Sequence, residues 1–294
     1  QEAVVGIEHE FSSKVSLSAR YVHKQIDTAI EDIGSLDAQG NEIYTIGNPG
    51  FGAAAQTGFG PAFPKAVRDY DSVEFTFNKR MADKWSLRAS YLWSRLYGNY
   101  SGLAQSDENG RTSPNVGRGF DYPLMAFGQH GKPVFGVLAT DRPHQFKTQF
   151  VYDTFVTAGL NFYAASGIPI TREAAMVTGS GFPIQYLGRN SDGRTPFFSQ
   201  LDLFLQKEMK LAGNKRIVFN VNVINVLDQN TVTNRNPTYL GAGQQVNIGE
   251  AEFFKGFDAQ ALIAAQKLAL NPLFLKDSEF QGARAIRLGA KFIF

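Results

Sequence analysis

The stretch Arg284–Phe294, which reads R-A-I-R-L-G-A-K-F-I-F, decides the fold. Apolar residues occupy every even-numbered position from 286 to 294. The odd-numbered positions hold Arg287, Gly289, Lys291 and, as an exception, the apolar Ile293. A period of two is that of a β-strand with one apolar and one polar face. A soluble sheet rarely ends on such a bare aromatic edge, whereas a closed transmembrane β-barrel pairs every strand.

Composition narrows the class of protein further. The chain has 294 residues, enough for one large β domain, and 29 Lys+Arg against 27 Asp+Glu, so its charge does not favour nucleic acid as a partner. We find no apolar run of about 18 residues, the length of a transmembrane helix. The absence of cysteine excludes a disulfide framework and thiol chemistry.

The same alternation recurs along the whole chain. It predicts nine strands, most of them about 10–13 residues long, which is enough to cross a bilayer at the usual tilt. The predicted strands cover about residues 3–11, 14–26, 70–81, 85–97, 142–152, 156–164, 200–206, 217–226 and 286–294.

The connections between these strands alternate between short and long. Four turns have only a few residues, and four loops have roughly thirty or more, a length that is uncommon in compact soluble domains. Outer-membrane barrels have short periplasmic turns and long extracellular loops. We therefore expect the long loops to be extracellular and Phe294 to be periplasmic. The predicted long loops are about Asp27–Asp69, Gly98–Asp141, Ser166–Pro196 and Asp228–Gly282.

A soluble β-sandwich or lipocalin-like barrel would also alternate, but its inner face would be apolar. Here aromatic residues gather near strand ends on the apolar face, as in an interfacial girdle, and the opposite face is polar. Two roles remain open for that face: a hydrated wall that contacts a plug or a solute, or a set of ion pairs that only solvate the interior. The residues predicted to form this lumen-facing wall are Glu8, Arg20, Glu74, Arg88, Lys147, Asp202, Arg287 and Lys291.

Nine is an odd number of strands, whereas bacterial single-chain barrels have an even number. We therefore expect residues 1–294 to be the C-terminal portion of a larger transmembrane β-barrel. The terminal strand, Ile286–Phe294, should pair with Ile217–Val226 on one side only. A closed nine-stranded barrel, in which the terminal strand pairs with Val4–Phe11, is the competing outcome.

No catalytic, cofactor-binding or metal-binding group is predicted. The four histidines lack a metal-ligand spacing, and no nucleophile and base converge on one site. We interpret His144 as structural. Residues 257–270 predict a short helix that is capped by Asp258 and ends before Pro272. This helix either lines a ligand vestibule or packs the last loop down.

Three further motifs carry a family resemblance. D-R-P-H at Asp141–His144 opens a strand after a long loop, F-N-V-N-V-I-N-V-L-D-Q-N covers Phe219–Asn230, and N-P-T-Y-L-G covers Asn236–Gly241. With the terminal aromatic strand, from about Tyr70 onward, this resembles the C-terminal half of TonB-dependent outer-membrane transporters, most closely the Oar-like group. The resemblance implies a 22-stranded barrel with an N-terminal plug domain inside it and a TonB box ahead of the plug. On this interpretation the sequence holds nine of the strands, and the plug, the TonB box and the thirteen N-terminal strands lie outside it.

The resemblance implies a function in the outer membrane of a Gram-negative bacterium. The expected activity is TonB-energised movement of a large substrate such as a peptide, protein or glycan. The alternatives are a passive porin or a structural or adhesive barrel, with an enzyme third. The implied partners are the N-terminal part of the same transporter, the TonB complex, outer-membrane lipid and the barrel assembly machinery. The last would read the terminal strand through Leu288, Ala290, Phe292 and Phe294.

Overall fold

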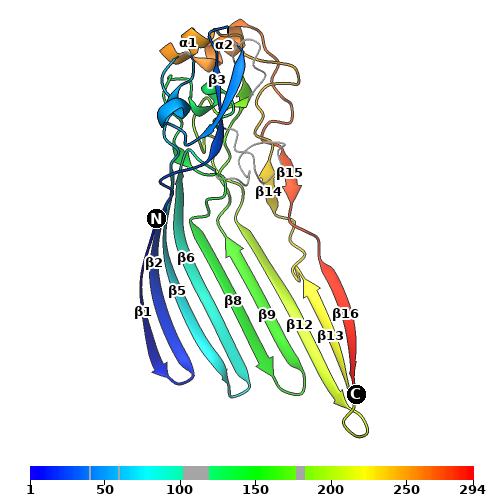
Figure 1. Cartoon of the computed structure of the whole chain (residues 1–294). Helices are drawn as coiled ribbons and strands as arrows, with labels where there is room; N and C mark the ends of the chain where they lie inside the picture. The colour runs from blue at the N-terminus through cyan, green and yellow to red at the C-terminus, as the bar shows by residue number, and fades with distance from the viewer. Residues whose placement is uncertain (40, 59, 102–118, 177–182) are drawn as a thin grey trace.

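A computed structural model describes residues 1–39, 41–58, 60–101, 119–176 and 183–294. The described chain consists of a long antiparallel sheet and a cap of loops at one end of it (Figure 1). The nine predicted long strands are all present. They are β1 (Glu2–Ser12), β2 (Val15–Gln25), β5 (Arg68–Ala82), β6 (Trp85–Gly98), β8 (His144–Asp153), β9 (Thr157–Ala165), β12 (Phe198–Lys210), β13 (Arg216–Ile224) and β16 (Ala285–Ile293).

Each long strand pairs with its neighbours along the chain, in the order β1-β2-β5-β6-β8-β9-β12-β13-β16, and the short β7 (Gly136–Val137) adds to β6. The predicted partner of the terminal strand is confirmed, because Ile217 lies opposite Phe292 and Val223 opposite Ile286. Within the described ranges, β1 pairs with β2 and with no other strand. The sheet is therefore open, with β1 and β16 at its two edges, and the closed nine-stranded alternative is wrong.

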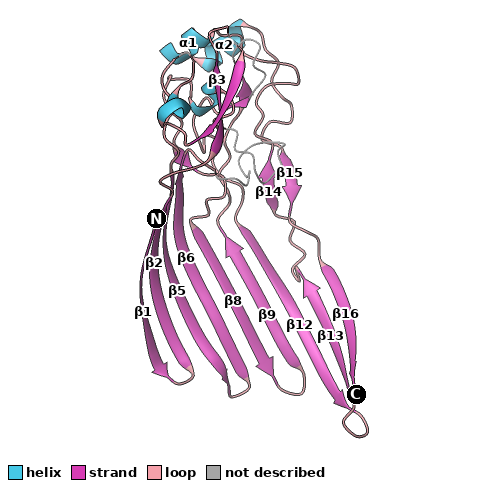
Figure 2. Ribbon diagram, viewed as in Figure 1, coloured by secondary structure: helices cyan, strands magenta, loops and turns pink. Residues whose placement is uncertain are grey.

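The short turns follow from local backbone chemistry. Asp83 and Lys84 join β5 to β6 with φ values of 54° and 71°. Two consecutive residues with positive φ match the right-handed twist of the flanking strands in a hairpin. In the turn between β12 and β13, the positive φ of 69° falls on Gly213, which adopts it without strain. All four short turns lie at the end of the sheet opposite the cap (Figure 2).

One face of the sheet is apolar and exposed. Along one row of paired residues, Leu17 lies opposite Phe77 and Phe77 opposite Ala89. Ile7 is 74% exposed and Leu288 is 79% exposed. A continuous apolar face of this extent requires an apolar surrounding, which for a strand-built protein is the bilayer.

The four long loops carry small elements, and the sequence pattern predicted only one of them, a short helix in the last loop. Among the described residues, these elements make paired two-stranded sheets and short helical turns within the cap (Figure 1). They are β3 (Glu31–Leu36) with β4 (Glu42–Gly47), β10 (Ala174–Ala175) with β11 (Pro183–Ile184), β14 (Val232–Arg235) with β15 (Asp277–Phe280), the 3-10 helices η1 (Gly52–Ala55) and η2 (Pro123–Ala126), and the α-helices α1 (Glu250–Lys255) and α2 (Ala259–Ala265).

The hydrophobic core of the molecule lies in this cap and not in the sheet. Leu124, Met176, Ile184 and Phe253 are 0% exposed and come from the second, third and fourth loops. The first loop joins them through Ile33, which is 1% exposed. The four loops therefore pack together as one unit, because they bury a shared apolar core.

The predicted helix is present but shorter than expected. α2 covers Ala259–Ala265, and Asp258 caps it by accepting hydrogen bonds from the backbone of Gln260 and Ala261. Ala259 and Ile263 pack into the cap core, so the helix holds the last loop down. Among the described residues, no helix is long and apolar enough to span a bilayer.

Candidate functional site: the polar face of the sheet and the loop cap

The eight residues predicted to form a polar wall all lie on one face of the sheet. Residues that pair directly across strands share a face, as do residues two positions apart. Arg20 pairs with Glu74, and Glu8 pairs with Ser18, two positions before Arg20. The same argument extends across the sheet, because each further pair of opposed residues is joined to the next by residues an even number of positions apart in one strand. These opposed pairs are Glu74 with Leu92, Arg88 with Gln149, Lys147 with Tyr163, Asn161 with Asp202, Phe204 with Asn222, and Asn222 with Arg287.

The part of the polar face on β1, β2, β5 and β6 is charged. Arg20 donates to Glu74 across strands at 2.6 Å. This pair, with Glu8 and Arg88, lines an open concave pocket of about 670 Å³. Because the pair is solvated, its net contribution to stability is modest, about 0–1 kcal/mol. The pocket can hold water or a polar ligand.

The part of the polar face on β8, β9 and β12 is richer in amides. The Tyr163 hydroxyl donates to Gln145 at 3.1 Å, and the Lys147 ammonium group lies 5.8 Å from the centre of the Tyr163 ring. Asp202 accepts from Gln200 at 2.9 Å. Amide groups both donate and accept hydrogen bonds, so this area suits an uncharged polar ligand as well as a charged one.

β16 completes the polar face at one edge of the sheet. Arg287 and Lys291 are exposed, and within the described chain neither forms an ion pair. Between them, a Cβ atom at Gly289 would lie 2.7 Å from the Asn220 side chain, so the glycine makes room for that amide. Of the four residues predicted as an assembly signal, Leu288, Ala290 and Phe292 lie on the opposite, apolar side of the strand, and Phe294 follows its end. Their recognition by the assembly machinery stays a prediction.

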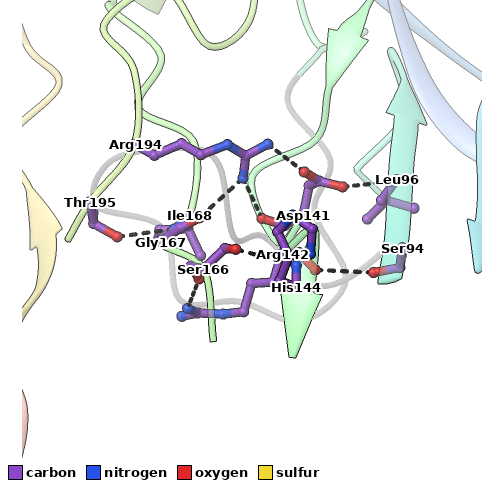
Figure 3. A network of polar contacts seen from close by, with 10 residues as sticks. All are labelled: Ser94, Leu96, Asp141, Arg142, His144, Ser166, Gly167, Ile168, Arg194 and Thr195. Atoms are coloured by element: carbon purple, nitrogen blue, oxygen red, sulfur yellow. Dashed lines mark hydrogen bonds and ion pairs between the residues drawn. The ribbon is translucent and has the colours of Figure 1, made fainter. Parts of the chain in front are cut away.

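The D-R-P-H motif forms the joint between the sheet and the cap. Figure 3 shows the Asp141 carboxylate between Arg194 and the Leu96 backbone. Arg194 also donates to the backbone carbonyls of Asp141 and Gly167, at 2.9 and 3.0 Å. The Asp141 side chain is only 1% exposed. A buried carboxylate is stable only when it is paired and hydrogen-bonded, and this network meets both conditions.

The other residues of the motif fix the start of β8. Arg142 donates to the Ser166 carbonyl at 2.6 Å, and the Ser94 hydroxyl donates to the Arg142 carbonyl at 3.1 Å (Figure 3). The His144 ring nitrogen lies 2.7 Å from the Tyr91 hydroxyl, at the cap end of β8. These contacts support the structural interpretation of His144.

A second pocket lies where the polar face meets the cap, and sequence reasoning missed it. It has a volume of about 470 Å³ and is lined by Lys24, Arg68, Tyr70, Arg142 and Gln145, among others. These residues lie at strand ends and in the adjoining loops, so their meeting depends on strand register. The alternation predicts which face each strand residue occupies, but not how far along the sheet it lies.

Within the cap, an arginine joins the third and fourth loops. Arg172 binds Asp192 through two nitrogens and lies over the rings of Tyr239 and Phe274, at 4.4 and 4.7 Å from their centres. Burial alone lowers the pKa of Arg172, but hydrogen bonds to Asp192 and Tyr186 raise it above its ordinary value. Arg172 therefore stays charged and holds the two loops together.

Buried tyrosines also join the cap loops. Burial, with the negative charge of Glu31, raises the pKa of Tyr100 to about 12. Burial and a hydrogen bond to Glu250 raise the pKa of Tyr122 above its ordinary value. That bond, at 2.8 Å, connects the second loop to α1 in the fourth. The phenols are thus stable in the folded cap only in their neutral form.

Titratable side chains meet at one further place in the sheet. Within the described ranges, no group of three or more His, Cys, Asp or Glu side chains could hold a metal ion. Asp71 lies 2.7 Å from the Tyr21 hydroxyl and 2.8 Å from the His23 ring, a cross-strand contact that the sequence did not reveal. This trio lies on the apolar face of the sheet, away from both pockets.

These features define a class of protein, namely an integral β-barrel protein of the membrane, here seen as an open sheet with one apolar face, one polar face and a cap of loops. Residues 1–185 match the family model described as an outer membrane beta barrel domain. The chain belongs to this outer-membrane β-barrel family. Its location is therefore the outer membrane of a Gram-negative bacterium, as predicted.

Among particular proteins, the chain is similar to the TonB-dependent transporter Oar of Myxococcus xanthus, with 30% identity over 313 aligned residues. The alignment covers 100% of this chain and 28% of the relative, so the chain spans under a third of that protein's length. This similarity confirms the resemblance to the Oar-like group.

Two solved structures are also similar. The ferric-catecholate import receptor Fiu from Escherichia coli K12 has a TM-score of 0.44 and 11% identity, over 98% of this chain and 27% of that one. The outer membrane transporter YddB from Escherichia coli has a TM-score of 0.49 and 13% identity, over 80% of this chain and 29% of that one.

Proposed function

We propose that this chain is the C-terminal portion of a TonB-dependent transporter that moves a large substrate, such as a peptide, protein or glycan, across the outer membrane. The observation that carries the proposal is the 30% identity to the TonB-dependent transporter Oar along the whole chain. The relatives named above are transporters and receptors, not enzymes. The partners in this proposal are the plug and remaining strands of the same protein, and the TonB complex.

The arrangement of the sheet supports this proposal. In a barrel, an apolar face toward lipid leaves the polar face toward the lumen, so Glu8, Arg20, Glu74 and Arg88 would line a hydrated path. The cap lies across one end of the strands (Figure 2). In the proposed orientation, the cap is extracellular and meets the substrate first, while the short turns and Phe294 are periplasmic.

The cap also supports a large substrate. Its loops pack on a shared core, and a preformed surface loses less conformational entropy on binding than separate flexible loops would. The pocket beneath the cap carries Lys24, Arg68 and Arg142 beside Tyr70 and Gln145. Such a surface offers charged, aromatic and amide groups to a peptide or a glycan.

The decisive test is energised uptake by cells that carry the intact protein. Fluorescently labelled peptide, protein and oligosaccharide pools are supplied to expressing cells and to cells that lack the gene. We expect one pool to accumulate only in expressing cells, and a protonophore or loss of TonB to abolish its accumulation. Uptake that ignores the proton gradient would identify a passive porin. Binding without any uptake would identify an adhesive or structural barrel.

A further inference from the structure

The pocket on the polar face of β1, β2, β5 and β6 is built by four strands that lie side by side (Figure 1). Its volume of about 670 Å³ is within the range of ligand pockets. The pairing of the strands places its side chains in three neighbouring rows on one face, so they form one continuous surface. The rows are Gly6, Arg20 and Glu74; Glu8, Ser18 and Thr76; and Ser16, Asn78 and Arg88.

Some charges in and beside this pocket neutralise each other. Arg20 donates to Glu74 at 2.6 Å within the first row. Glu10, which lies beside the third row, accepts from Arg80 at 3.2 Å. A ligand gains little from these groups, because each already has a partner of opposite charge.

Glu8 and Arg88 are the two charges that remain. Both side chains are exposed, and in the part of the chain that the structure describes neither forms an ion pair or a side-chain hydrogen bond. The neutral side chains of Ser18, Thr76 and Asn78 lie between them. The pocket therefore presents one negative group and one positive group, with hydroxyl and amide groups in the middle.

The spacing of the two charges sets the length of a matching ligand. Neighbouring strands lie about 4.8 Å apart and successive residues about 3.4 Å, so the Cα atoms of Glu8 and Arg88 are on the order of 16 Å apart. Side chains that lean into the concave pocket bring the charged groups to roughly 10 Å, a gap that about three extended residues span. A short peptide therefore has the right length to reach both groups.

We propose that this pocket binds a short stretch of peptide, with an ammonium group at Glu8 and a carboxylate at Arg88. The peptide backbone meets the side chains between them, which both donate and accept hydrogen bonds. A neutral oligosaccharide fits less well, because it leaves both charges of the pocket without a partner. The inference rests on the proposed function, which brings substrate to the polar face, and it deepens that function by naming peptide as the substrate class.

The test measures the binding of trialanine to the purified intact protein in neutral detergent by saturation-transfer NMR. Trialanine carries one ammonium group, one carboxylate and no charged side chain. E8Q and R88Q should each weaken binding about threefold to fivefold, which is the strength of a good exposed ion pair. Added salt should weaken binding to the parent, and R88K should retain most of the affinity.

Blocked peptides test the orientation of the ligand. N-acetyl-trialanine lacks the ammonium group, so E8Q should not weaken its binding further. Trialanine amide lacks the carboxylate, so R88Q should have no further effect on it. R95Q is the matched control, because Arg95 is an exposed arginine on the opposite face of the same strand. This variant should bind trialanine like the parent.

The proposal is overturned if the parent does not bind trialanine, if R95Q loses as much affinity as R88Q, or if E8Q weakens the acetylated peptide as much as the free one. Maltotriose that binds as tightly as trialanine would identify a glycan site instead. Trialanine binding without energised uptake overturns the transport proposal alone. Energised uptake by a protein that does not bind trialanine overturns this site alone.

Discussion

The cap and the sheet show opposite relations between regularity and burial. The sheet is regular, with one uninterrupted ladder of strands, yet its apolar side chains are largely exposed, as at Leu288 and Phe292. The cap is irregular, yet it holds residues such as Phe253 and Tyr186 that are 0–1% exposed. The sheet depends on lipid to cover it, whereas the cap supplies its own apolar partners.

This difference shows where each region gains its stability. In a bilayer, unpaired backbone groups are costly, so the sheet is held by its ladder of backbone hydrogen bonds. The cap has few regular ladders and is held by apolar burial together with side-chain links such as Arg172 to Asp192. The two regions should therefore respond differently to the same type of substitution.

The largest expected effect is that of a cavity in the cap core. Phe253→Ala removes a ring that is 0% exposed and lies 5.4 Å from the ring of Phe254. We expect a loss of about 3–5 kcal/mol in cap stability. Phe219→Ala, on the apolar face and 46% exposed, should cost less than half of that, because lipid or detergent fills the space. Hydrogen exchange in micelles measures both, and equal losses would contradict the comparison.

The next largest loss of stability is expected from a substitution at the joint between the sheet and the cap. Arg194→Met leaves the buried Asp141 carboxylate without its cation, and we expect a loss of about 3 kcal/mol. The double variant D141N/R194M should recover part of this, because it removes the charge while the amide oxygen can still accept from the Leu96 backbone. Urea unfolding followed by hydrogen exchange measures the coupling. If the double variant is as unstable as R194M, the unpaired charge of Asp141 is not the cause of the lost stability.

A smaller effect is a loss of stability at high pH that is confined to the cap. An unfolded tyrosine ionises near pH 10, whereas burial raises the pKa of Tyr100 to about 12. The folded cap therefore favours the neutral phenol. Its stabilising effect is complete below about pH 10 and is lost as the pH rises toward 12. Tyrosinate absorbance and cap hydrogen exchange should change together in this range, and Tyr100→Phe should reduce the change. If the sheet loses its protection from hydrogen exchange at the same pH as the cap, the two regions do not unfold independently.

The comparison also explains which predictions were confirmed. The alternation of Leu288 and Phe292 with Arg287 and Lys291 is a local property of one strand, so it can be read without knowing the neighbours. The helix at the end of the chain was predicted because its Asp258 cap is local too. Its length was overestimated, because α2 ends at Ala265 while the apolar pattern continues.

The cap core could not be predicted in the same way. Ile33 and Phe120 carry no periodic signal, and they meet across nearly ninety residues of sequence only when the strands have brought the loops to one end. The pocket lined by Lys24, Arg68 and Arg142 has the same origin. The eight polar-wall residues share one face of the sheet, and their role in a lumen stays a proposal.

The sequence by itself determined the strands, their two faces and the order in which they pair, because side-chain alternation and short turns are encoded within a few residues. Only the tertiary structure decided that the loops share one core and that Asp141 is bound by Arg194. These features depend on contacts between distant segments, and such contacts leave no periodic mark in the sequence.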